Sequence, residues 1–136
     1  DSHGNIGIFG MPNKILNSSG INIANIKGGN SSTQGCLIDV FSDSSYIIFT
    51  NDEGNSSLDM KLRYHTISFN ENVLLKNKIL LDSVSEGLNI VSHRNNRSRW
   101  LLTHKINSDK NYFFLIKSST IICPTVQRFG GDYIHG

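Results

Sequence analysis

The scarcity of helix-forming residues is the feature that most restricts the fold of this 136-residue chain. Ala24 is the single alanine and only three glutamates are present, whereas asparagine and serine together supply a quarter of the residues. Asn and Ser side chains compete with helical hydrogen bonds by bonding to nearby backbone groups, while the abundant Ile, with Phe, Tyr and Thr, suits a pleated strand. We therefore expect an all-β fold with enough apolar residues to build a core.

Short apolar segments bounded by Asn, Ser, Gly and Asp recur along the chain, which is the pattern of strands joined by tight turns. Three segments are continuously apolar: Y-I-I-F at 46–49, K-I-L-L at 78–81 and Y-F-F-L-I at 112–116. Such runs indicate strands that are covered on both faces, as in stacked sheets. The segments predict strands at 5–9, 21–26, 35–41, 45–50, 61–69, 78–82, 88–93, 99–104, 111–117 and 120–127.

Two of these segments resemble each other and define a repeat. S-S-Y-I-I-F-T at 44–50 and S-R-W-L-L-T at 98–103 each combine an aromatic residue, two aliphatic residues and a threonine. Each is preceded by one predicted strand and followed by two, so the repeating unit has four antiparallel strands, as in a propeller blade. A single β-sandwich is the alternative. Because Tyr46 and Trp100 occupy the same repeat position, both are expected to serve in a blade core.

The propeller interpretation treats residues 1–136 as one region of about two full blades and a partial one, possibly a fragment of a larger propeller. Its parts are a partial first blade at 1–34, blades at 35–84 and 85–128, and the start of a next unit at 129–136.

Charge and hydropathy argue against two classes of partner. A net charge of +2 is too small for an electrostatic nucleic-acid surface, and the basic cluster of Arg94, Arg97 and Arg99 is expected to be a solvated hairpin tip. No run approaches the ~20 apolar residues of a membrane span. The first residues lack the pattern of a secretion signal, so we expect any such signal to be removed or to lie outside this chain.

The two cysteines do not form a disulfide scaffold. Cys36 and Cys123 lie in apolar segments, which favours buried free thiols on strands. A bridge between them is the alternative if the protein is exported.

Three histidines are weak candidates for a metal site. His93 and His104 end two successive predicted strands, where antiparallel pairing is expected to bring them together, and His65 lies in the preceding unit. Zinc requires three or four ligands in tetrahedral array, and the chain has no HExxH or CxxC motif. We therefore expect histidines that bond to loop backbone, with neither a metal nor another cofactor.

Two polar loops are weak candidates for a calcium site. The first offers Asp52 and Asn55, and the second offers Asp109. Neither loop matches the EF-hand pattern, and each would need further oxygen ligands from elsewhere. Ordinary polar turns are therefore expected.

The sequence predicts a protein that is not an enzyme. Most serines lie in loop clusters that turn bonding explains, and no G-x-S-x-G motif is present. Glycoside hydrolysis needs two carboxylates ~5–9.5 Å apart. The sequence does not exclude two such pairs, Asp52 with Glu53 and Asp82 with Glu86, because their spacing in three dimensions is unknown.

Several short motifs, taken in order, resemble those of one family. They are M-P-N at 11–13, S-S-T-Q at 31–34, Y-I-I-F-T at 46–50, L-R-Y at 62–64, K-N-K-I-L-L at 76–81, E-G-L-N-I-V-S-H at 86–93 and W-L-L-T-H at 100–104. In this order and spacing the chain resembles the propeller-like N-terminal region of secreted, gliding-motility-associated surface proteins of Bacteroidetes. The segment at 6–14 departs from that family because it is shorter than the stretch usually found there.

The resemblance implies export by the type IX secretion route and an extracellular or cell-surface location. It also implies an adhesive or scaffolding role, with a protein or a surface glycan as ligand and the remaining blades of a parent protein as neighbours. It supplies no catalytic residues. The alternative is that the chain is part of a secreted propeller hydrolase or lyase that acts on glycans. Ser83, in D-S-V at 82–84, looks like the acceptor used for O-glycosylation of exported proteins in that group.

Overall fold

The secondary structure of this protein consists of strands. The computed structural model describes residues 8–11, 13–27, 36–51, 61–95, 97–105, 108–117 and 119–128, and these contain no helix. The all-β prediction is therefore confirmed.

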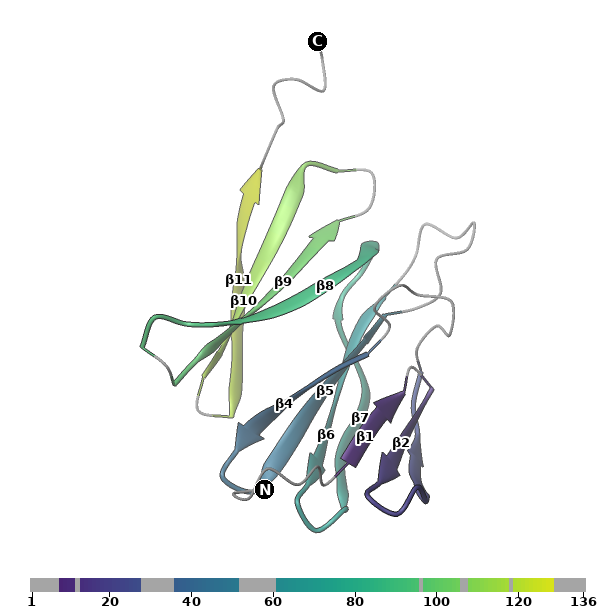
Figure 1. Ribbon diagram of the computed structural model, residues 1–136. Coiled ribbons are helices and arrows are strands. Elements are labelled where there is room, and N and C mark those ends of the chain that lie inside the picture. Colours follow the sequence, from purple (N-terminus) through teal and green to yellow (C-terminus); the bar gives the residue numbers. More distant parts are fainter. Residues whose placement is uncertain are drawn as a thin grey trace.

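The strands form three antiparallel sheets that follow one another along the chain (Figure 1). The first sheet has three strands and the other two have four each, in sequential order. We call them the first, middle and last sheets. The first sheet contains β1 (Ile8–Met11), β2 (Lys14–Asn17) and β3 (Asn22–Asn25); the middle sheet contains β4 (Cys36–Ser42), β5 (Ser45–Asn51), β6 (Leu62–Ser68) and β7 (Val73–Leu81); the last sheet contains β8 (Val84–Ser92), β9 (Arg99–Lys105), β10 (Lys110–Lys117) and β11 (Thr120–Arg128).

Two strands, β7 and β8, begin earlier than the predicted residues 78 and 88, and one strand, β2, is new. β2 was not predicted because its four residues are too few to display an apolar pattern. β7 begins at Val73 rather than at residue 78, because Asn77 interrupts the strand without ending it. Asn77 has a φ of 60°, and the pairing register of β6 with β7 shifts across it, between Lys78 and Leu75. A left-handed Asn at such a shift is the local form of a β-bulge.

Burial of both faces of the middle sheet determines how the sheets stack. On β5, Ile47 and Phe49 point into a core shared with the last sheet, whereas Ile48 points into a core shared with the first sheet. The prediction that Y-I-I-F is covered on both faces is thus confirmed. The large core contains Ile47, Phe49, Leu62, Val84, Leu88, Leu101, Phe114 and Ile116, and the small core contains Ile8, Ile15, Ile26, Ile48 and Ile67.

The same prediction is wrong for the other two apolar runs. β7 is an edge strand, and its Ile79 side chain is 47% exposed. On β10, Phe114 and Ile116 enter the large core, but Phe113 and Leu115 lie on the opposite face and are half-buried. No described strand covers that face of the last sheet.

The middle and last sheets pack against each other through equivalent positions of their strands. Ile47 and Leu101 are each the third residue of the second strand of their sheet, and both are fully buried in the large core. β7 and β8 are joined only by Asp82 and Ser83, so the end of β7 and the start of β8 lie within roughly 11 Å of each other. Ser83 has a φ of 58°, which allows the sharp corner. None of the three sheets closes on itself among the described residues.

The first sheet lies very close to β4. A Cβ atom at Gly10 would lie 2.6 Å from both Cys36 Sγ and Ile38 Cδ1, which is closer than atoms pack. A residue without a side chain is therefore needed where β1 crosses β4.

Replacing Leu101 by alanine tests whether the large core holds the two four-stranded sheets together. We expect the free energy of unfolding to fall by about 2–5 kcal/mol, because a fully buried leucine leaves a cavity when it is truncated. Leu74→Ala is the matched control: Leu74 is 60% exposed, so a loss of about 0.5 kcal/mol or less is expected. Urea denaturation followed by circular dichroism measures both, and equal losses would contradict this arrangement of the core.

Candidate functional site

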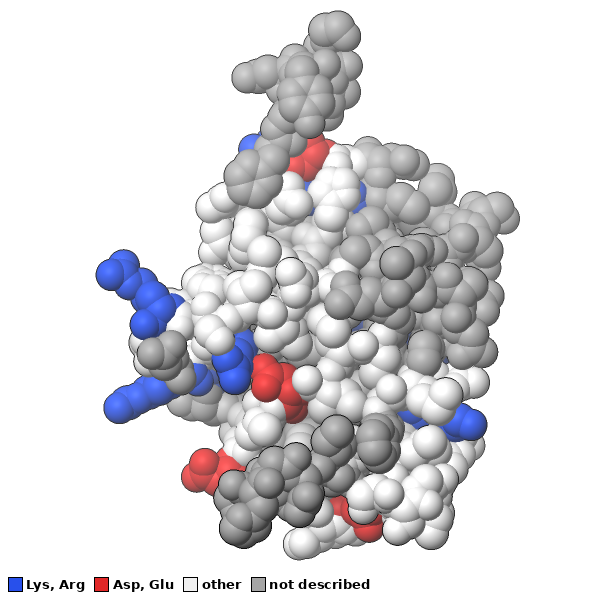
Figure 2. All heavy atoms as spheres, viewed as in Figure 1, with Lys and Arg blue, Asp and Glu red and all other residues white. Residues whose placement is uncertain are grey.

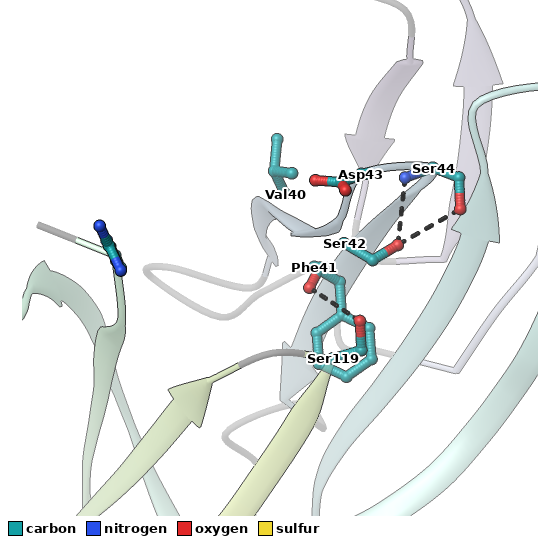
Figure 3. A pocket seen from close by; sticks show the side chains of 7 residues that line it. Val40, Phe41, Ser42, Asp43, Ser44 and Ser119 are labelled. Carbon is teal, nitrogen blue, oxygen red and sulfur yellow. Dashed lines mark hydrogen bonds between the residues drawn. The ribbon is translucent and has the colours of Figure 1, made fainter.

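A polar pocket of about 550 Å³ lies where turns of the middle and last sheets converge (Figure 3). Its lining combines residues 40–44 of the β4–β5 hairpin with Arg97 of the β8–β9 turn and Ser119 of the β10–β11 turn. We call it the turn pocket. It brings together residues that are far apart in the sequence, and hairpin turns on a rigid scaffold are common places for binding residues.

The β4–β5 turn supplies one wall of hydroxyl groups. The Ser42 hydroxyl accepts a hydrogen bond from the Ser44 backbone N–H at 3.2 Å and lies 2.6 Å from the Ser45 hydroxyl. Figure 3 shows Asp43 and Ser44 above Ser42, with Phe41 and Ser119 lower still. The Ser119 hydroxyl reaches the Phe41 carbonyl at 3.5 Å, which links the β10–β11 turn to this wall. The wall is therefore fixed by its own hydrogen bonds.

Asn95 gives the β8–β9 turn its shape. Its Oδ1 atom accepts hydrogen bonds from the backbone N–H groups of Arg97 and Ser98, at 2.9 and 3.0 Å. Its own N–H donates to His93 Nδ1 at 3.1 Å. Asn side chains stabilise turns in this way. The Arg97 backbone is held in place while its side chain is exposed at the pocket.

An ion pair between the sheets lies close to the turn pocket. Arg99 Nε on β9 is 3.2 Å from Asp39 Oδ2 on β4, without the alignment of a hydrogen bond. The Arg99 guanidinium also donates to the Ser92 hydroxyl. Asp39 and Arg99 thus help to fix the last sheet over β4. The prediction that the basic cluster is a solvated hairpin tip is confirmed for Arg94 and Arg97, which are exposed. Arg99 instead belongs to strand β9 and has a carboxylate partner.

Opposite charges line the turn pocket without neutralising each other. Within the described residues, neither the Asp43 carboxylate nor the Arg97 guanidinium forms an ion pair. Figure 2 shows Lys and Arg side chains projecting from the molecule where the β8–β9 turn lies. A guanidinium binds carboxylate or phosphate oxygens, while hydroxyls and a carboxylate bind hydroxyl groups. The pocket therefore suits a polar ligand that carries an anionic group.

His65 is buried and fully bonded. Its Nε2 atom is 2.9 Å from Thr50 Oγ1, and its Nδ1 atom accepts a hydrogen bond from the Asn77 backbone N–H at 2.9 Å. Thr50 Oγ1 donates to the Lys27 carbonyl, so the proton between Thr50 and His65 is on His65 Nε2. Burial, and then the positive charges of Arg63 and Lys76, lower the pKa of His65 from 6.5 to about 4.

The other two histidines do not join His65. His93 follows β8 and bonds to Ser98, whereas His104 pairs with Asn111 near the far end of β9. The ends of two successive antiparallel strands lie at opposite ends of the hairpin, so the expected proximity of His93 and His104 is wrong. Among the described residues, no group of three His, Cys, Asp or Glu side chains is arranged to hold a metal ion.

The remaining candidates are dispersed. The Asp109 carboxylate accepts a hydrogen bond from the Arg128 guanidinium at 3.1 Å, which links β10 to β11. Asp52 and Asn55, like Glu53 of the first carboxylate pair, lie outside the described residues. Asp82 forms an ion pair with Lys61 at 3.2 Å, and the side chain of Glu86 lies outside the described part. The glycosylation candidate Ser83 is half-buried in the β7–β8 corner.

The cysteines and the repeated aromatic residues differ in part from expectation. Cys36 and Cys123 are free thiols on different sheets. Cys36 is half-buried, and burial raises its pKa to about 11, but Cys123 is exposed on the edge strand β11. Tyr46 packs against the small core as expected. Trp100 belongs to neither core, because it points away from the large core on a face that no described strand covers.

The turn pocket was missed by the sequence analysis because no motif marks it. Polar turns after residues 42, 92 and 117 were visible as breaks between apolar segments. Which of these turns meet depends on how the two sheets stack, and periodicity does not specify that.

Comparison with known proteins finds no match among family models, curated proteins or solved structures. Within the described part, no helix is long and apolar enough to cross a membrane.

The pKa of His65 predicts a loss of stability in acid. Because its pKa is lower in the folded state than the ordinary 6.5, His65 contributes stability that is complete above pH 6.5 and is lost as the pH falls through about 4. At about 1.4 kcal/mol for each pKa unit, the loss is about 3 kcal/mol. Protonation places a hydrogen on Nδ1, which then faces the Asn77 N–H donor.

Urea denaturation at pH 7 and at pH 4 measures this effect. His65→Gln, which cannot titrate, should lose about 3 kcal/mol less than the native chain between these pH values. His104→Gln is the control and should keep the native dependence, since His65 is unchanged in it. An identical acid loss in His65→Gln and the native chain would contradict the assignment.

Proposed function

We propose that this chain is a non-catalytic binding or scaffolding module of an exported cell-surface protein. The observation that carries the proposal is the turn pocket, where turns from two sheets converge on an arginine and a carboxylate that lack ion-pair partners among the described residues. A preformed site with uncompensated polar groups is typical of ligand recognition. The ligand contacts come from Arg97, Asp43 and the serine hydroxyls.

The exported, surface location and the role in adhesion or gliding motility are supported only by the resemblance of the sequence to gliding-motility-associated proteins. A protein or a surface glycan with an anionic group is the ligand that suits the pocket best.

We further propose that the sheets form a stacked, sandwich-like module. Equivalent positions of propeller blades face the same way around the ring, so they do not meet. Here Ile47 and Leu101 meet in the large core, and two residues join β7 to β8, which favours the sandwich alternative.

A binding experiment on the 136-residue chain tests the function. Purified protein is applied to an immobilised panel of acidic oligosaccharides, neutral oligosaccharides and acidic peptides, and the affinity of each hit is measured by titration. We expect an anionic probe to bind and Arg97→Ala to weaken it about tenfold or more, because a hydrogen bond to a charged group is lost.

Arg94→Ala is the matched control for Arg97→Ala. Arg94 belongs to the same turn and is exposed, but it does not line the pocket, so its replacement should leave affinity unchanged. Equal losses in both variants would show attraction by overall charge rather than a site. Cleavage of any probe, abolished by Asp82→Asn, would overturn the non-catalytic assignment in favour of a glycan hydrolase or lyase.

A further inference from the structure

The turn pocket has opposite charges on turns of two different sheets. Asp43 belongs to the β4–β5 turn of the middle sheet, and Arg97 belongs to the β8–β9 turn of the last sheet. Both residues are exposed, and neither forms an ion pair with a described residue. The pocket of about 550 Å³ therefore offers two separate charged groups to a ligand.

The backbone on both sides of the pocket is held by local hydrogen bonds. In the β4–β5 turn, the Ser44 N–H donates to the Ser42 hydroxyl at 3.2 Å. In the β8–β9 turn, the Arg97 N–H donates to Asn95 Oδ1 at 2.9 Å. A ligand therefore meets turns that are already formed, which lowers the entropy cost of binding.

The hydrogen-bonding groups of the two turns differ in kind. A guanidinium only donates, so Arg97 suits an acceptor such as a carboxylate. The Asp43 carboxylate only accepts, and the hydroxyl groups of Ser42 and Ser44 in the same turn are also able to accept (Figure 3). An ammonium group has three donors and no acceptor, so it is the ligand group that suits the β4–β5 turn.

A ligand with an anionic group alone would leave Asp43 without a partner. Its charge would be attracted by Arg97 but repelled by Asp43, because both residues line the same pocket. A ligand that also carries a cationic group gains attraction at both residues. The charges of the described lining thus favour a ligand with one charge of each sign.

An apolar surface lies in the same pocket as these charges. Val40 is 55% exposed and lines the pocket together with the half-buried Phe41. Lysine carries its ammonium group on a flexible four-carbon stem, and such stems cover apolar surface while the charge stays in water. A lysine side chain therefore suits both the apolar and the acidic part of the lining.

We propose that the turn pocket binds a peptide segment that carries a lysine and a nearby carboxylate, with the ammonium group on Asp43 and the carboxylate on Arg97. This inference rests on the proposed binding function of the turn pocket and names its ligand as a protein rather than a glycan.

Peptides with blocked ends test the proposal, because only their side chains are charged. Each two-charge peptide has one lysine and one glutamate, separated by up to three glycines. Norleucine in place of lysine gives a glutamate-only peptide, and glutamine in place of glutamate gives a lysine-only peptide. Acidic oligosaccharides with free amino groups represent glycans. Calorimetric titration measures the affinity of each probe for the 136-residue chain.

We expect at least one two-charge peptide to bind about tenfold or more tightly than either of its single-charge forms, because each charged hydrogen bond contributes to affinity. Overall attraction does not explain such a preference. The chain has a net charge of +2, which favours the glutamate-only peptide over a peptide without net charge.

Two substitutions assign the two charged contacts. Asp43→Asn should weaken the two-charge peptide about tenfold or more without weakening the glutamate-only peptide, because it removes both the partner of the ammonium group and the repulsion of the carboxylate. Arg97→Ala should weaken both peptides. Because both residues are exposed, the variants should fold as the native chain does, which circular dichroism checks.

Glu71→Gln is the matched control for Asp43→Asn. Glu71 is also an exposed acidic residue of a hairpin turn, but it lies between β6 and β7 and does not line the pocket. Its replacement should leave every affinity unchanged. Equal losses in Asp43→Asn and Glu71→Gln would show that net charge sets the affinity, which would contradict the inference.

The remaining outcomes separate the inference from the proposed function. Equal affinity for the two-charge and glutamate-only peptides, with both lost in Arg97→Ala, would overturn the inference and leave the proposed function in place. Binding of an acidic oligosaccharide, but of no peptide, would do the same by assigning the pocket to a glycan. Binding of no probe at millimolar concentration, or binding that Arg97→Ala leaves unchanged, would overturn both.

Discussion

Burial of consecutive residues on β5 is the constraint on which the rest of the structure depends. Because successive side chains of a strand point to opposite faces, Ile47 and Ile48 can both be fully buried only if a layer covers each face of the middle sheet. The last sheet supplies one layer and the first sheet supplies the other. The three-layer stack is thus a direct consequence of one short apolar run in the middle of the chain.

Polar groups give the smaller of the two interfaces its specificity. Five isoleucines form the small core, and similar side chains alone would allow the first sheet to shift. The Lys27 backbone, just after β3, removes that freedom: its carbonyl accepts from Thr50 and its N–H donates to Asn77 Oδ1 at 2.7 Å. His65 joins Thr50 to Asn77 beneath them. This network runs from the exposed Lys27 backbone to the buried His65, and it favours one arrangement because a slip of the first sheet would leave its buried members unpaired.

The sequence predicted the features that local chemistry controls. Scarce helix formers gave the all-β class, and alternation or continuity of apolar residues located most strands. It failed where a distant segment decides the outcome. Whether Ile79 or Trp100 is covered depends on whether a sheet lies over it, and both were wrongly expected to be buried for that reason. The turn pocket could not be predicted from the sequence, because Ser42, Arg97 and Ser119 come together only when the two sheets stack.

The stack also explains why the turn pocket differs in chemistry from the faces of the sheets. Turns at the end of the layers are solvated and carry the charges that a packed face excludes, so Asp43 and Arg97 occur there. The outer face of the last sheet is built on the same alternation as a core face, yet no described strand covers it. Its side chains therefore include apolar residues such as Trp100 and Leu115, and polar residues such as His104 and Asn111 further along the same strands.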